Sequence, residues 1–86
     1  MKASVTLAIH HIDVLDGVRL GDLTSLLMST YKQVPHVSGD EMSVVMATDK
    51  PIELIEAFEA LTVTLAMRFS PFLWTSVVLQ WSTLQP

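Results

Sequence analysis

Two adjacent histidines, His10 and His11, are the residues of this 86-residue sequence best suited to chemistry. An imidazole can bind a metal ion or transfer a proton near neutral pH. Both histidines lie in the segment LAIHHIDV, whose alternation of apolar and other residues is typical of a β-strand. Adjacent side chains of a strand point to opposite faces, so the pair cannot chelate one ion. The sequence therefore predicts no metal site and gives the two histidines different surroundings.

His11 is predicted to end the helix-packed face of its strand, two residues before Asp13. A histidine and an aspartate at this spacing can form a hydrogen bond, and the carboxylate would then fix the tautomer of the ring. One interpretation is that His11 acts as an acid–base group or orients a ligand. The other is that His11 only lies at the rim of the core, where Asp13 provides its hydrogen-bond partner. The third histidine, His36, is expected about 10 Å away, too far for a shared site.

His10 belongs to the other face of the strand, which the predicted fold leaves without helices. A solvent-facing sheet normally carries charge there, but this face carries almost none. Its predicted members are Thr6, Ala8, His10, Ile12, Val45, Phe72, Trp74 and Val78. We expect this face to be buried between subunits, with Trp74 near its centre. The residues predicted to bind a ligand are His10, His11, Asp13 and Trp74.

The N-terminal elements that position these side chains follow from periodicity. Residues 3–14 alternate and predict a strand, and Asp16-Gly17 marks a turn. Asp22 is suited to cap the helix that the leucines after it indicate. An alternative treats the residues on either side of Asp16-Gly17 as the two strands of a hairpin.

The rest of the chain predicts two strands, a helix and a final strand. Residues 34–37 and 42–48 are extended runs joined by a longer hairpin loop, and Pro35 assigns the first run to a sheet edge. A helix begins at Pro51 and ends near Arg68. Its predicted buried stripe consists of Leu54, Ile55, Phe58, Leu61, Thr62 and Leu65. The segment FLWTSVVLQWSTL after it is strand-like.

This order of elements predicts an α+β fold with a single domain over residues 1–86. It is a ferredoxin-like βαββαβ sandwich, in which a four-stranded antiparallel sheet carries two helices on one face. The element order resembles that of many small ferredoxin-like modules, among them amino-acid-sensing, thiamine-binding and dimeric α/β-barrel proteins. The resemblance rests on element order, so it implies no site residue.

The amino-acid composition reduces the number of possible functions further. Half of the residues are apolar and only 16% are charged, which is more apolar surface than so small a domain can bury alone. We therefore expect a homo-oligomer. The net charge is −4 and the five basic residues are scattered, which argues against nucleic acid as a partner. There is no cysteine for a disulfide or a thiol nucleophile, and no uncharged stretch is apolar enough to span a membrane.

No sequence motif indicates a particular reaction, and the sequence predicts no cofactor and no catalytic residue. The favoured hypothesis is a small cytoplasmic, oligomeric module that binds a ligand or regulates, without enzymatic activity. One alternative is a protein-interaction module, such as a small adaptor or inhibitor, including a viral one. A second alternative is a small dimeric enzyme of the α/β-barrel type that uses His10 or His11 as its acid–base group.

Overall fold

The computed structural model describes residues 2–13, 15–68 and 74–81 and confirms the predicted order of elements. The elements are β1 (Ala3–His10), α1 (Gly17–Tyr31), β2 (His36–Ser38), β3 (Glu41–Thr48), α2 (Pro51–Arg68) and β4 (Trp74–Trp81). The strand order in the sheet is β2-β3-β1-β4, and every neighbouring pair is antiparallel. This is the ferredoxin-like α+β arrangement.

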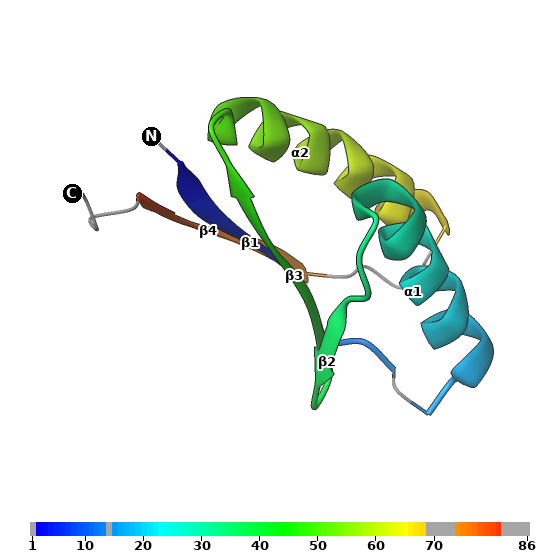
Figure 1. Cartoon of the computed structure of the whole chain (residues 1–86). Coiled ribbons are helices and arrows are strands. Elements are labelled where there is room, and N and C mark those ends of the chain that lie inside the picture. Colours follow the sequence, from blue (N-terminus) through cyan, green and yellow to red (C-terminus); the bar gives the residue numbers. More distant parts are fainter. Residues whose placement is uncertain (1, 14, 69–73, 82–86) are drawn as a thin grey trace.

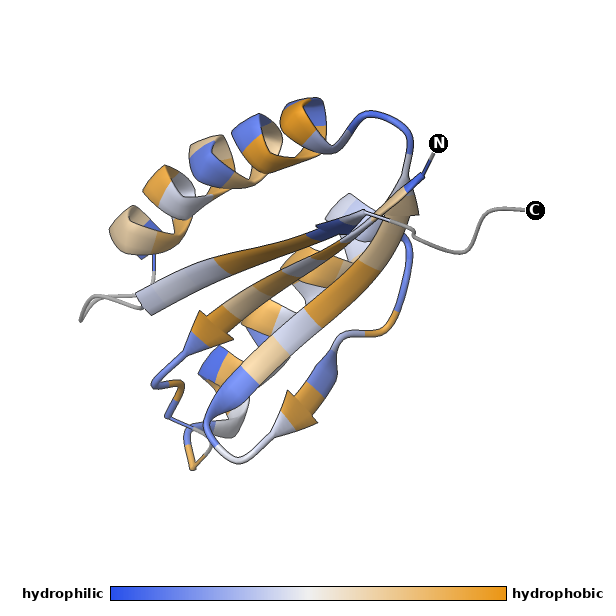
Figure 2. Cartoon of the chain, turned by 90° about the vertical axis from the view of Figure 1, so that its left-hand side faces the viewer, coloured by the Kyte–Doolittle hydropathy of each residue, from blue (hydrophilic) through white to orange (hydrophobic). Residues whose placement is uncertain are grey.

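Both helices lie on the same side of the sheet, and α2 packs against β1 and β4 (Figure 1). The core fills the space between the helices and the sheet, and its most buried large side chains include Phe58, Ile9, Leu23 and Met42. Burying each such side chain contributes about 1.5–3 kcal/mol. Figure 2 looks toward the other side of the sheet, which neither helix covers and which we call the open face.

The first helix begins earlier than predicted. Its N-cap is Asp16, whose carboxylate accepts a hydrogen bond of 3.0 Å from the backbone N–H of Arg19. Asp16 satisfies an amide that would otherwise be orphaned at the helix start, and the apolar stripe then already includes Leu20. The prediction of Asp22 as the cap is wrong, and so is the alternative hairpin across Asp16-Gly17.

The β2–β3 hairpin is tighter than predicted. Ser38 pairs with Glu41, which leaves Gly39 and Asp40 as a two-residue turn instead of a longer loop. Gly39 has a φ of +60°, a left-handed conformation that glycine adopts without a steric penalty. The assignment of this strand to a sheet edge is confirmed, although β2 begins at His36, just after Pro35.

The second helix follows its predicted pattern closely. Phe58 and Leu65 are buried, the other four residues of the predicted stripe are partly buried, and Glu53 and Glu56 are exposed. Neither of the two described helices is long and apolar enough to cross a membrane. In β4, Val77 and Leu79 pack toward the core, on the face opposite to Trp74 and Val78. Phe72, predicted for the open face, lies outside the described residues.

Candidate functional site

The end of β1 departs from regular alternation at one residue. His11 has a φ of +62°, and the next amide, that of Ile12, donates a hydrogen bond of 2.9 Å to the carbonyl oxygen of Asp40. The left-handed residue shifts the alternation by one position. Ile12 therefore joins the core with 4% exposure, and its predicted place on the open face is wrong.

The same backbone conformation corrects the predicted surroundings of His11. Its side chain is 66% exposed instead of packed beneath the helices, and its Nδ1 lies 3.4 Å from Oδ2 of Asp40. Its ring meets the ring of Trp74 edge to face, with centroids 6.4 Å apart. Asp13 is not its partner, because Oδ1 of Asp13 accepts the backbone N–H of Leu15 at 3.1 Å.

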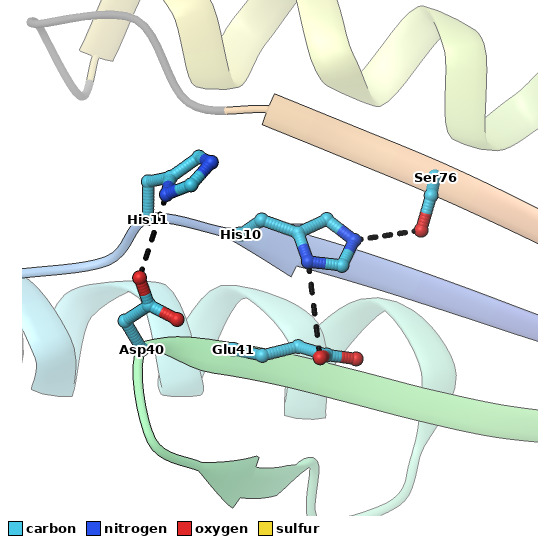
Figure 3. Close-up of polar contacts among 5 residues, drawn as sticks. All are labelled: His10, His11, Asp40, Glu41 and Ser76. Carbon is cyan, nitrogen blue, oxygen red and sulfur yellow. Dashed lines mark hydrogen bonds and ion pairs between the residues drawn. The ribbon is translucent and has the colours of Figure 1, made fainter.

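His10 lies on the open face, as predicted, between residues of two neighbouring strands. Its Nε2 is 2.7 Å from Oγ of Ser76 on β4, and its Nδ1 is 3.8 Å from Oε2 of Glu41 on β3 (Figure 3). The His10 side chain is only 31% exposed, because these neighbours flank it on both sides. Both of its nitrogens are thus directed at polar groups of the same sheet.

The two histidine rings are closer than side chains on opposite faces of a strand would be. Their centroids are 6.5 Å apart, and each ring faces a carboxylate of the hairpin, Asp40 or Glu41 (Figure 3). The six residues that meet here, called the histidine cluster below, are His10, His11, Asp40, Glu41, Trp74 and Ser76. The structure thus brings together three of the four predicted ligand-binding residues and leaves Asp13 in a local turn. Trp74 pairs with His10 at the end of the open face, so its predicted place near the centre of that face is wrong.

An intervening strand separates His36 from His10 and His11, as the predicted fold requires. It pairs with Ser43 of β3, and β3 lies between β2 and β1. Within the described part of the chain, no three histidine or carboxylate side chains are arranged to hold a metal ion. The cluster can instead exchange hydrogen bonds and protons, because it combines imidazoles, carboxylates and a hydroxyl.

The rest of the open face is small and uncharged. Across the three long strands, Thr6 pairs with Val45 on one side and with Val78 on the other. These two valines are 56% and 52% exposed. Ala8 is flanked in the same way by Ser43 and Ser76. Among the strand residues of this face, none is a lysine or arginine, and Glu41 is the one carboxylate.

Sequence reasoning missed Asp40, Glu41 and Ser76. Each becomes a neighbour of the histidines only through pairing between strands distant in sequence. The signal that could have found Ser76 and Glu41 is the predicted strand order combined with alternation, which places both on the open face beside β1.

A surface depression lies where the start of α1 approaches the end of α2. It is an open depression lined by Asp16, Val18, Arg19, Asp22 and Arg68, and it shares no residue with the histidine cluster. Its charges are mutually compensating, since Nε of Arg19 lies 3.9 Å from a carboxylate oxygen of Asp16.

No family model, curated protein or solved structure matches the chain.

Proposed function

We propose that the protein is a homodimeric module that binds a small ligand. In this proposal two open faces pack against each other, and the histidine cluster at one end of each face contacts the ligand. The observation that carries the proposal is a sheet face with a single carboxylate at its end, on which Val45 and Val78 are each more than half exposed. Apolar side chains gathered on one face are typical of an interaction surface.

The size of the open face suits a small dimer. Three of its strands have eight residues each, which gives a face about 26 Å long and about 15–19 Å wide. Two such faces bury on the order of 800–1,000 Å² in total, near the lower limit for a specific interface. A dimer of moderate, concentration-dependent stability is therefore expected.

A second copy of the chain is the occupant that best suits the chemistry of this face. Serine, threonine and alanine side chains leave it flat, and two flat sheets can approach to about 10 Å. The strand residues of the face include no lysine or arginine and only one carboxylate, which lies at its end, so the face can meet itself without burying like charges at the centre. A strongly charged partner would find no complementary group at the centre of the face.

The ligand site is assigned to the histidine cluster because polar groups converge there beside apolar surface. Ligand sites commonly combine an apolar wall with a few fixed polar groups. Here Trp74, which is 62% exposed, supplies the wall. His10 supplies a hydrogen-bonding group whose orientation is set by its contacts with Ser76 and Glu41.

The dimer is tested by sedimentation of the wild-type chain and of Val45→Asp. We expect the wild type to be a dimer at micromolar concentrations and Val45→Asp to be a folded monomer, because the dimer would bury its new charge. The matched control is Val63→Asp, since Val63 is 61% exposed on α2 and lies outside the open face. A monomeric wild type would contradict the proposal, and so would a stable complex that forms only with a different protein.

The ligand site is tested by NMR with a library of small carboxylates, amines and aromatic compounds. Bound compounds should perturb the backbone amide signals of His10 and Ser76 and the indole signal of Trp74. The signals of the charged depression around Arg19 serve as an internal control. Perturbations confined to that depression, or no perturbation at all, would contradict the assignment.

A further inference from the structure

Three polar side chains from three adjacent strands form a continuous chain of contacts on the open face. The hydroxyl of Ser76 meets Nε2 of His10 at 2.7 Å, and Nδ1 of the same ring lies 3.8 Å from Glu41. Each ring nitrogen therefore has one partner, a hydroxyl on one side and a carboxylate on the other (Figure 3). This is the order in which a nucleophile, a base and an orienting group act in covalent catalysis.

The carboxylate determines which nitrogen of His10 carries the proton. A neutral imidazole has one N–H donor and one acceptor, and the negative charge of Glu41 favours the N–H on the nearer nitrogen, Nδ1. Nε2 is then the acceptor that can remove the proton of Ser76. A separation of 3.8 Å exceeds a hydrogen bond, so Glu41 acts through its charge and stabilises the imidazolium once it forms.

We propose that Ser76 is a nucleophile that attacks activated acyl compounds such as aryl esters. Its oxygen bonds to the carbonyl carbon while its proton passes to Nε2 of His10. The bond to the leaving alcohol then breaks, and the alcohol takes that proton. Water attacks the acyl-serine, again giving a proton to His10, which returns it to Ser76 as the carboxylic acid departs. The step consumes only the ester and water.

In the single chain the three groups are accessible enough for this chemistry. The side chains of His10 and Glu41 are 31% and 43% exposed, and Ser76 is partly buried on the same face. The neighbouring exposed indole of Trp74 gives an aryl leaving group an apolar surface. All three groups come from one chain, so this inference goes beyond the proposed dimer and does not depend on it.

The test is acetylation of the full chain by p-nitrophenyl acetate, followed by nitrophenolate release and by peptide mass mapping. We expect acetyl-Ser76 in the wild type and its loss in Ser76→Ala, which removes one oxygen atom and little packing. The matched control is Ser43→Ala, because Ser43 and Ser76 flank Ala8 from opposite sides and, although Ser43 pairs with His36, only the hydroxyl of Ser76 is hydrogen-bonded to a histidine. His10→Gln should slow acetylation of Ser76 roughly 10²-fold or more, whereas His36→Gln should not.

Glu41 is a positioning residue, and its role needs a readout other than folding. Glu41→Gln should slow acetylation, while Glu41→Asp should retain part of the rate, with both variants checked for unchanged circular dichroism. Three results would overturn the inference. The acetyl label persists in Ser76→Ala, it is found on histidine or lysine, or it decreases equally in Ser43→Ala. A wild type acetylated no faster than Ser76→Ala would also overturn it. The monomeric Val45→Asp variant should still be acetylated, which separates this inference from the proposed dimer.

Discussion

The two faces of the sheet are made by the same strands and differ in what covers them. On β3, Val44 lies beneath the helices with 3% exposure, whereas the adjacent Val45 on the open face is 56% exposed. The covered face carries large apolar side chains such as Ile9 and Met42, while the open face carries mostly small ones. The contrast shows that the chain covers one face by itself and leaves the other exposed, which is the condition that the proposed dimer requires.

The sharpest test of this contrast places one charge on each face of β3. Val44→Asp should lose about 4 kcal/mol or more of unfolding free energy, because it buries an unpaired carboxylate. So small a domain would then be largely unfolded. Val45→Asp should lose about 1 kcal/mol or less from the fold itself. Urea unfolding at one fixed protein concentration measures both, and equal losses would show that the two faces are equally buried.

A second test extends the contrast to the helix that covers the sheet. Phe58→Ala should cost about 3–5 kcal/mol, since it leaves a cavity where a ring with 2% exposure was packed. Val63→Ala, on the solvent side of α2, should change stability by no more than about 0.5 kcal/mol. Thermal unfolding compares the pair. A large loss from Val63→Ala would mean that a partner covers the outer side of this helix.

A smaller effect is expected at Tyr31, the last residue of α1, which is packed into the covered core. Among the described residues its buried hydroxyl has no hydrogen-bond partner, and burial raises its pKa above the ordinary value. Tyr31→Phe should therefore leave stability unchanged or raise it by about 1 kcal/mol at neutral pH.

The sign of the pH dependence follows from the raised pKa of Tyr31. The folded chain retains the phenol proton at a pH where the unfolded chain has lost it. The resulting stability is complete below the unfolded value of about 10 and is lost as the pH rises through the folded value. Tyr31→Phe should lack this alkaline loss. The phenolate absorbance of the single tyrosine reports the titration directly, and a normal titration midpoint would contradict the prediction.

The smallest effect on stability is expected at His11, where the left-handed backbone interrupts the alternation of side chains between the two faces. A left-handed conformation is costly for any residue with a Cβ and free for glycine. His11→Gly should therefore gain about 0.5 kcal/mol. His11→Ala, which also removes the ring but keeps the Cβ, should not gain. Equal stability of the two variants in urea would show that backbone strain at this position is negligible.

Most of the fold could be predicted because alternation and helical periodicity are local properties of the sequence. The errors fall where two local signals compete. Asp16 and Asp22 are both chemically suited to cap a helix, and only the packing of the chain before Leu23 decides between them. The two-residue turn at Gly39-Asp40 likewise depends on how Ser38 and Glu41 pair.

The candidate site could be predicted only in part, because its geometry depends on contacts between distant strands. The position of His10 follows from alternation alone. The position of His11 does not, because its conformation accompanies a hydrogen bond from Ile12 to Asp40 in the β2–β3 hairpin. The partners Ser76 and Glu41 require the sheet order as well, so the sequence indicated a pair of histidines but not their contacts.

The position of β4 also has a consequence for how the protein folds. β4 is an edge strand that pairs only with β1. The pairing runs from Ala3 opposite Trp81 to His10 opposite Trp74, so it joins the two ends of nearly the whole chain. Long-range pairing of this kind is slow. Until it forms, β4 remains an uncharged, strand-forming segment with neither proline nor glycine, a type prone to pair with other chains. Refolding yield should therefore fall as protein concentration rises, even where the folded state itself is stable.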